Sequence, residues 1–308
     1  MSSQYLAEAT LLTHLIAIIR SLRFVAHLCK GLAIALIYPY LQLSARRKIL
    51  QKWSRKLLSI FNITINFQDS CSADNCYQGL IITNHISWLD VFVLNAIVPM
   101  RFVAKSEVRR WPVIGWLCER VQTFFIERGS ARSAARINVQ LVELLKRGES
   151  LAVFPEGTTT EGTSVAHFHS SLIQPAIDAG AKVFPMAIRY HDRQGMHSKV
   201  PAYIDEVSFG ASLWTILTTR ELHVQLVSTP VLEASGAERR QLTLQAQQNI
   251  SAMLDSLHAV VKKREQPFQE KVLEPTQDEL QAEMHFQSLY GVLLNPPMSS
   301  ENMRREVK

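Results

Sequence analysis

Short apolar runs alternate with amphipathic stretches through the middle of the chain. The apolar runs are typical of buried strands, and in the stretches between them apolar residues recur every three to four positions, as on one face of a helix. The expected strands are residues 80–83, 101–104, 123–126, 151–154 and 183–188, and the expected helices are 87–97 and 130–147. Gly148 is placed to end the second helix. Strands that alternate with helices predict a layered α/β domain with a mostly parallel sheet.

A long amphipathic helix is expected at the end of this domain, which we bound at residues 57–264. Its apolar positions share one face, at Leu242, Ala246, Ile250, Met253, Leu254 and Leu257. The basic run 262–264 closes it. The remaining residues, 265–308, carry several prolines and more acidic than basic side chains. We therefore expect an acidic, partly disordered tail there.

The N-terminal part of the chain holds its surplus of apolar residues. Two apolar stretches, 11–19 and 31–43, are interleaved with nine Lys or Arg residues, and the chain has no Asp or Glu from residue 9 to residue 68. The net charge of all 308 residues is +6, so the basic surplus is local. Positive charge follows the first apolar stretch instead of preceding it, which argues against a cleaved secretory signal.

Each apolar stretch is shorter than the roughly 20 residues that cross a bilayer. A single helix joining both would bring Arg20, Arg23 and Lys30 into the membrane, at about 2.5 to 3.5 kcal/mol each at the helix centre. We therefore predict that residues 1–56 form two helices in or on one leaflet, held by apolar burial and by anionic headgroups. A pair of ordinary core helices is the alternative.

Two other classes of partner are disfavoured. The basic residues lie among leucines and isoleucines and not in a polar stripe with stacking aromatics, so we expect no nucleic acid partner. A zinc site needs about four ligands at characteristic spacing, and the four cysteines do not supply them. We expect free thiols, in a reducing compartment, and no metal.

The sharpest chemical motif follows the strand expected at 80–83, with the sequence Asn-His-Ile-Ser-Trp-Leu-Asp at residues 84–90. On a continuous helix His85 and Asp90 would lie about 140° apart around the axis. With His85 on the turn and Asp90 in the first helical turn, the carboxylate can accept from one ring nitrogen and leave the other as a base. Ser87 and Asp90 also have nearly the spacing of a capping box, a structural reading that is compatible with the chemical one.

A second polar segment follows the strand expected at 151–154. It reads Phe-Pro-Glu-Gly-Thr-Thr-Thr and offers Glu156, Gly157 and Thr158 to a polar headgroup, since glycine lets backbone approach a ligand closely. A bare turn is the alternative reading.

A third segment places Arg128 just before the helix expected at 130, where it can clamp a phosphate or carboxylate. A surface salt bridge is the alternative for Arg128, and Lys105 is a second cation available for a phosphate. The nucleophile-elbow, phosphate-loop, dinucleotide-binding and zinc-protease motifs do not occur in the sequence.

These segments, in this order and spacing, resemble the 1-acylglycerol-3-phosphate acyltransferase family over about residues 61–260. His85 and Asp90 match the family's His-x4-Asp motif. Three further family blocks match at 125–128, 154–158 and 183–188. The resemblance implies a layered fold typical of glycerolipid acyltransferases.

The resemblance also implies an activity, namely transfer of a fatty acyl group from acyl-CoA or acyl-carrier protein to the free hydroxyl of a lysophospholipid. The implied acceptor is 1-acyl-sn-glycerol-3-phosphate and the product phosphatidic acid. His85 would be the general base and Asp90 would orient it, with no metal or redox cofactor. The implied location is the cytoplasmic face of a membrane, the inner membrane in a bacterium.

One residue departs from the phosphatidate-forming pattern. Many such members carry Arg where this chain has Thr159, and the residues that follow look more like the branch of lyso-ornithine lipid acyltransferases. Lyso-ornithine lipid is therefore the alternative acceptor. Lysophosphatidate stays the favoured acceptor because Arg128 and Lys105 are cations that can bind its phosphate. A non-catalytic membrane protein that binds lipid is the alternative of another class.

Overall fold

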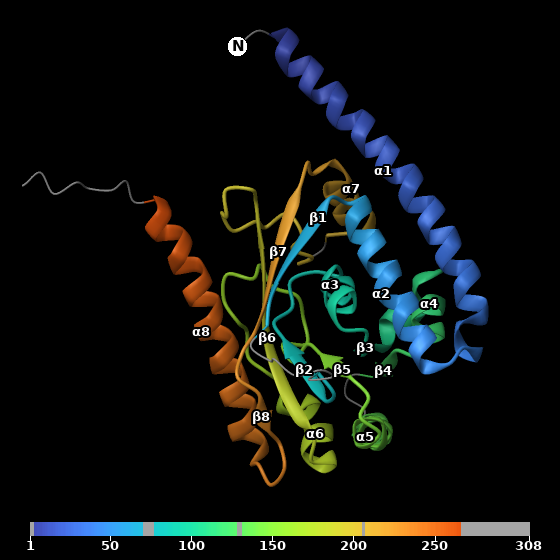
Figure 1. Ribbon diagram of the computed structural model, residues 1–308, viewed down its shortest axis with the longest axis vertical. Helices are drawn as coiled ribbons and strands as arrows, with labels where there is room; N and C mark the ends of the chain where they lie inside the picture. The colour runs from blue at the N-terminus through green and yellow to red at the C-terminus, as the bar shows by residue number, and fades with distance from the viewer. Residues whose placement is uncertain (1–2, 70–76, 128–130, 205–206, 266–308) are drawn as a thin grey trace, which may run out of the picture. The chain divides into compact units, whose positions relative to one another are not determined.

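The computed structural model describes residues 3–69, 77–127, 131–204 and 207–265. Contacts divide the chain into Met1–Val261 and Lys262–Lys308, and the fold is that of the first unit. It is built on one sheet with the order β1-β7-β6-β2-β5-β3-β4, in which β8 also pairs with β6 (Figure 1). The strands are β1 (Ile63–Gln68), β2 (Leu80–Thr83), β3 (Arg101–Lys105), β4 (Phe124–Ile126), β5 (Leu151–Val153), β6 (Lys182–His191), β7 (Leu222–Ser228) and β8 (Leu232–Glu233).

Neighbouring strands are parallel, except that β6 runs antiparallel to β7 and β8. The predicted α/β architecture with a mostly parallel sheet is confirmed. Each expected strand is present within about one residue of its predicted ends, apart from the last, which extends to His191 as β6. That extension lies beyond the end of β2, where residues 84–90 begin.

Helices cover both faces of the sheet. They are α1 (Ser3–Ile37), α2 (Leu43–Ile60), α3 (Asp90–Ile97), α4 (Ile114–Arg120), α5 (Ala131–Lys146), α6 (Gln174–Ala179), α7 (Phe209–Thr218) and α8 (Arg239–Glu265), with short 3-10 turns at Tyr38–Tyr40, Ser106–Arg110 and Ser170–Leu172. One core cluster joins the sheet to α2, α3 and α7, and a second joins it to α5, α6 and α8. The predicted apolar face of α8 is confirmed, since Leu242, Ala246, Ile250 and Leu254 are buried.

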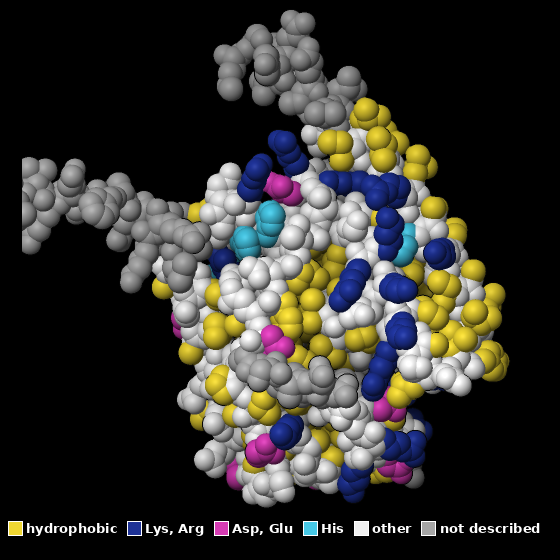
Figure 2. Space-filling model, viewed as in Figure 1, with side chains coloured by type: hydrophobic (Ala, Val, Ile, Leu, Met, Phe, Trp, Pro, Cys, Tyr) yellow, Lys and Arg dark blue, Asp and Glu magenta, His cyan; other side chains and the backbone are white. Residues whose placement is uncertain are grey.

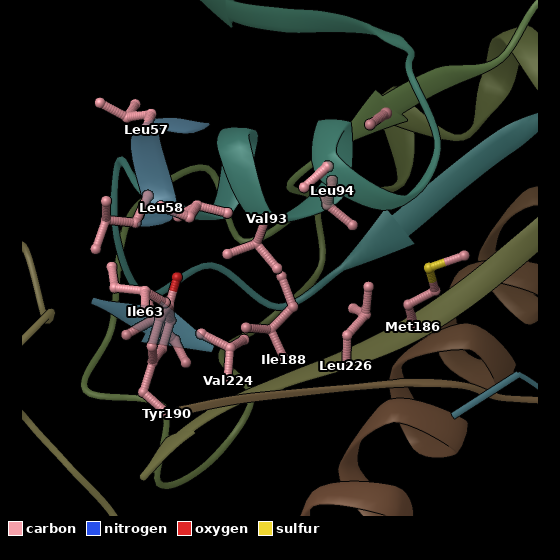
Figure 3. Packing of buried hydrophobic residues seen from close by; sticks show 14 of the residues in the cluster. Leu57, Leu58, Ile63, Val93, Leu94, Met186, Ile188, Tyr190, Val224 and Leu226 are labelled. Atoms are coloured by element: carbon pink, nitrogen blue, oxygen red, sulfur yellow. The ribbon is translucent and has the colours of Figure 1, made fainter. Parts of the chain in front are cut away.

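Strand β6 contributes to both clusters because its side chains alternate between the two faces. Val183 and Ala187 belong to the cluster under α5, α6 and α8. Met186, Ile188 and Tyr190 belong to the cluster under α2, α3 and α7, where Figure 3 shows them beside apolar side chains of the neighbouring elements.

Two predicted helix boundaries can be compared with the structure. Gly148 follows α5 with φ +74°, in the left-handed region that suits glycine, and its N–H donates to the carbonyl of Leu145 at 2.9 Å. Its predicted role as a helix stop is confirmed. The helix expected from Ser87 begins only at Asp90, because the residues between β2 and α3 form an irregular turn.

The predicted division of the N-terminal segment is wrong. Residues 1–56 do contribute two helices, but the first apolar stretch and residues 31–37 of the second lie in the single helix α1, and the second helix, α2, is the basic segment. By length and composition, Thr13–Tyr40 is long and apolar enough to cross a membrane.

The contacts of Arg20 explain how α1 can be one continuous helix although it contains charged residues. Arg20 is 8% exposed, and its guanidinium donates to the carbonyls of Leu217, Thr219 and Arg220 at the end of α7. These carbonyls lack partners within α7, as the last carbonyls of any helix do. The folded domain therefore accepts this charge, and the cost that we assigned to burying it in lipid does not arise.

The opposite face of α1 is exposed and apolar. Its large exposed side chains are Leu15, Ile18, Ile19, Leu22, Val25, Leu36 and Ile37. Beside it, Lys and Arg side chains follow α2 in a line (Figure 2). The region thus combines apolar burial capacity with positive charge, as membrane-surface helices do.

Helix α2 also supports α3, the helix that begins with Asp90. Its Arg55 donates through Nε to the carbonyl of Ala96 at 2.7 Å, and its Gln51 donates to the carbonyl of Ile97 at 2.8 Å. Both carbonyls lie at the C-terminal end of α3. Because Asp90 is the first residue of α3, these contacts help to hold the helix that carries it.

Candidate active site

His85 and Asp90 lie together at the end of β2. His85 is on the turn that follows the strand, and Asp90 opens α3. The Nδ1 atom of His85 lies 2.8 Å from Oδ2 of Asp90. The structure therefore has the arrangement expected from the spacing, with the chain bend and not a helix face bringing the two groups together.

The carboxylate of Asp90 is fully buried and has hydrogen bonds on both oxygens. Its Oδ2 also accepts from the backbone N–H groups of Ile86 at 2.7 Å and Ser87 at 2.9 Å. Its Oδ1 accepts from the hydroxyl of Tyr190 at 2.7 Å. A buried carboxylate needs such partners, and Asp90 has four of them.

The capping-box reading of Ser87 and Asp90 is confirmed in one half, because Oδ2 of Asp90 accepts from the N–H of Ser87 at 2.9 Å. The residue before α3 is Leu89, and its side chain makes no cap. The hydroxyl of Ser87 instead accepts from the N–H of Leu89 at 3.3 Å, and Asp90 reaches back to the turn. The N–H groups of Ile86, Ser87, Leu89 and Asp90 are thus used within the turn.

The ring of His85 has one fixed side and one accessible edge. It stacks on the ring of Phe154 with centroids 3.8 Å apart and planes 14° apart. Its side chain is 20% exposed. Within the part of the chain that the structure describes, Nε2 has no hydrogen-bond partner, so that nitrogen is available to a hydroxyl.

Glu156 holds the backbone of His85 in place. Its Oε1 accepts from the N–H of His85 at 2.7 Å and its Oε2 from the N–H of Ala166 at 2.9 Å. Glu156 is 4% exposed, and this burial raises the pKa of its carboxyl. We expected Glu156 to meet a headgroup, but both oxygens are occupied by backbone donors, a geometry that favours a positioning role.

The carbonyl of His85 and the residue before it are fixed as well. Thr160 donates to this carbonyl through its N–H at 2.8 Å and through its hydroxyl at 3.2 Å. The side-chain amide of Asn84 donates to the carbonyl of Ile188 at 2.9 Å and accepts from its N–H at 2.8 Å. The turn that carries His85 is therefore anchored to β6 and to the loop after β5.

The remaining predicted substrate contacts lie in different places. Gly157 has φ +65°, and a Cβ there would come within 3.0 Å of the His169 ring, so this position favours glycine. Thr158 is exposed beside it, and Lys105 is exposed at the end of β3. Arg128 lies outside the described residues.

Thr159, the residue that departs from the phosphatidate-forming pattern, makes an internal contact. Its hydroxyl donates to the carbonyl of Tyr203, and the N–H of Tyr203 donates to the carbonyl of Ile86 at 2.9 Å. Thr159 thus ties the loop after β5 to the segment that covers the catalytic turn.

Among the residues that the structure describes, no group of three or more His, Cys, Asp or Glu side chains is arranged to hold a metal ion. Cys29 and Cys118 are free thiols, and Cys71 and Cys76 lie outside the described residues.

Sequence reasoning missed two residues of this site, Tyr190 and the aromatic support Phe154. Phe154 had a signal, because it opens the segment that carries Glu156. Tyr190 had none, since it lies 100 residues beyond Asp90 in the chain. Pairing of β6 with β2 is what brings it close.

Comparison with known proteins identifies the family. A family model described as acyltransferase matches residues 65–189. The lyso-ornithine lipid O-acyltransferase of Pseudomonas aeruginosa is 36% identical over 212 residues, which is 68% of this chain and 79% of the relative. The chain belongs to this acyltransferase family. Within this acyltransferase family, the 1-acyl-sn-glycerol-3-phosphate acyltransferase of Neisseria gonorrhoeae is 39% identical over 161 residues, 52% of this chain.

The match to the Neisseria acyltransferase spans 63% of that protein's length. The fold of this chain also resembles the crystal structure of the 1-acyl-sn-glycerophosphate (LPA) acyltransferase PlsC from Thermotoga maritima. The TM-score is 0.54 at 17% sequence identity, covering 78% of this chain and 98% of the other. This likeness concerns the fold.

Proposed function

We propose that this acyltransferase-family protein transfers a fatty acyl group from a thioester to the free hydroxyl of a membrane lysolipid. The observation that carries the proposal is the His85–Asp90 pair at 2.8 Å, with Nε2 available at the accessible edge of the ring. Relatives in the same family are named for acyl transfer to 1-acyl-sn-glycerol-3-phosphate and to lyso-ornithine lipid.

The proposed reaction needs one base and no covalent enzyme intermediate. Nε2 of His85 takes the proton of the acceptor hydroxyl as its oxygen attacks the thioester carbonyl carbon. The tetrahedral intermediate then collapses, the C–S bond breaks, and the leaving thiolate takes the proton from the imidazolium. Asp90 holds the proton on Nδ1 and balances the positive charge of the ring, and base catalysis of this kind contributes about 10² to 10⁴-fold.

The exposed apolar face of α1 supports a membrane location for this reaction, because the lysolipid acceptor resides in a bilayer. We propose the cytoplasmic face, the inner membrane in a bacterium, since acyl-CoA and acyl-carrier protein are the donors implied by the family resemblance. The line of positive charge along α2 adds attraction to anionic headgroups, about 1 kcal/mol per Lys or Arg near the surface.

For the acceptor, we propose 1-acyl-sn-glycerol-3-phosphate, with Lys105 and Arg128 as the cations for its phosphate and Gly157 and Thr158 beside the headgroup. One observation favours lyso-ornithine lipid as the second candidate. Thr159 replaces the expected arginine, and its hydroxyl is used by the carbonyl of Tyr203.

Acyl transfer by the purified full chain in lipid vesicles tests this proposal. Labelled acyl-CoA, and in parallel acyl-carrier protein, is offered with lysophosphatidate or with lyso-ornithine lipid, and kcat/KM is compared. The proposal predicts acylated product with at least one pair and a higher kcat/KM for lysophosphatidate. A higher kcat/KM for lyso-ornithine lipid would show that this lipid, and not lysophosphatidate, is the preferred acceptor. Lipid binding without turnover for every pair would favour the non-catalytic alternative.

A further inference from the structure

Tyr190 places a single hydroxyl at the buried side of the catalytic pair. Its side chain is fully buried and lies among apolar residues on the face of β6 that also carries Ile188 (Figure 3). The hydroxyl donates to Oδ1 of Asp90 at 2.7 Å. Within the described chain, this is the one hydrogen bond to Oδ1, whereas Oδ2 accepts from His85, Ile86 and Ser87.

We propose that Tyr190 is a positioning residue for acyl transfer, whose hydroxyl fixes the Asp90 carboxylate so that Oδ2 stays on Nδ1 of His85. The proposal rests on the proposed function of the His85–Asp90 pair. No part of Tyr190 contacts the substrate in this account, because it acts through Asp90.

The two oxygens of Asp90 explain why one distant hydroxyl matters. Rotation about the last side-chain bond of Asp90 exchanges Oδ1 and Oδ2 or turns both away from the ring. The three donors to Oδ2 all come from one short turn, so they fix the position of that oxygen but not the plane of the carboxylate. The hydroxyl of Tyr190 holds the other oxygen from the opposite side, which defines the plane and the direction offered to His85.

Strand β6 delivers this contact with a fixed geometry. Ile188 is held to Asn84 by two hydrogen bonds, and Tyr190 follows two residues later on the same face. Tyr190 is also paired with Val224 of β7, so its backbone belongs to the ladder. One strand therefore holds both ends of the catalytic turn, at Asn84 and at Asp90.

The hydroxyl also affects the charge of the pair. Burial and the neighbouring Asp90 charge raise the pKa of Tyr190 well above its ordinary value, so this hydroxyl remains a donor. Its hydrogen bond disperses part of the carboxylate charge. Without it, the carboxylate charge of Asp90 attracts a protonated His85 ring more strongly.

Few other charged groups face the pair. From the loop after β5, Glu156 contacts the backbone N–H of His85, and its pKa is raised by burial. From β6 the facing group is Tyr190. In the described residues no other ionisable side chain is hydrogen-bonded or ion-paired with His85 or Asp90, so a change in their titration on removing the Tyr190 hydroxyl is attributable to that hydroxyl.

The experiment is acyl transfer by Tyr190→Phe across pH, with Tyr77→Phe as the matched control. Tyr77 is also buried in the same core cluster, and its hydroxyl donates to a different carboxylate, that of Asp69. For Tyr190→Phe we expect kcat/KM to fall about tenfold, the size of one hydrogen bond to a charged group, through kcat and not KM. The acidic limb of its pH profile should move to higher pH by about half a unit or more. Tyr77→Phe should leave the pH profile in place.

A double variant separates positioning from general loosening of the core. Adding Tyr190→Phe to Asp90→Asn should lower activity by less than about twofold, because the hydroxyl acts through the carboxylate that is already lost. Additive losses would overturn the proposal. So would a Tyr190→Phe enzyme with an unshifted pH profile, or an equal shift in Tyr77→Phe. If His85→Ala retains activity, the proposed function fails first, and that result is distinct from a failure of Tyr190 alone.

Discussion

Asn84 and Ile188 are 104 residues apart in the chain, yet the side-chain amide of one makes both hydrogen bonds to the backbone of the other, at 2.8 and 2.9 Å. Asn84 is fully buried, as is Ile188. The amide completes the pairing between β2 and β6 at the point where β2 has already turned toward α3. This contact joins the residue before His85 to the strand that carries Tyr190.

Replacing Asn84 by Leu should destabilise the fold. It leaves a buried N–H and a buried carbonyl of Ile188 without partners, at about 1 to 3 kcal/mol each. We expect the free energy of unfolding in urea to fall by about 2 to 6 kcal/mol. Asn95, whose Oδ1 accepts from one N–H, that of Met100, is the comparison, and Asn95→Leu should cost less. An equal or smaller loss for Asn84→Leu would contradict the account.

Glu156 should give the stability of the protein a distinct dependence on pH. Burial raises the pKa of its carboxyl above the ordinary value of 4.5, so the folded protein keeps this proton at a pH where the unfolded chain releases it. The contribution of Glu156 to stability is therefore complete below pH 4.5 and is lost as the pH rises through the folded pKa.

The comparison with Glu156→Gln isolates this effect, because glutamine does not titrate. Relative to this variant, the wild-type protein should lose unfolding free energy as the pH is raised above 4.5 in urea titrations. A difference that stays constant, or that grows in favour of the wild type, would show that burial does not dominate at Glu156.

The exposed face of α1 should govern attachment to membranes. Replacing Ile18 and Leu22 together by Asn removes two exposed apolar side chains, each worth about 1.5 to 3 kcal/mol when fully buried. We expect sedimentation with anionic liposomes to fall at least about tenfold while the folded structure is retained. The matched control replaces Val139 and Leu244, which are similarly exposed on α5 and α8. Equal losses of sedimentation in the two double variants would contradict the role of α1 in membrane attachment.

The sequence predicts the parts of the fold that local patterns determine. The strands at Leu80–Thr83 and Leu151–Val153, and the helix ended by Gly148, are short-range features, and the structure has them where expected. The proximity of His85 and Asp90 also follows locally, because only the four residues 86–89 separate them in the chain. For the same reason their mutual geometry was predictable without knowledge of the rest of the chain.

Features that depend on distant segments were not predicted. In the sequence, the charge of Arg20 disfavours one continuous N-terminal helix. The carbonyls that accept from its guanidinium lie at the end of α7, some 200 residues away, so no local pattern indicates them. The antiparallel strand β7, which lies between β1 and β6, carries no signal of its position in the sheet. Tyr190 reads as one more strand residue, and its hydroxyl acquires a role only when β6 pairs with β2.

The most direct test of the central claim is acyl transfer by His85→Ala in vesicles, with labelled acyl-CoA and a saturating lysolipid. His167→Ala, which removes an exposed histidine, is the control. The account predicts that His85→Ala loses about 10² to 10⁴-fold in kcat, while His167→Ala stays near the wild-type value. A His85→Ala enzyme within about tenfold of the wild type would contradict the assignment of His85 as the base.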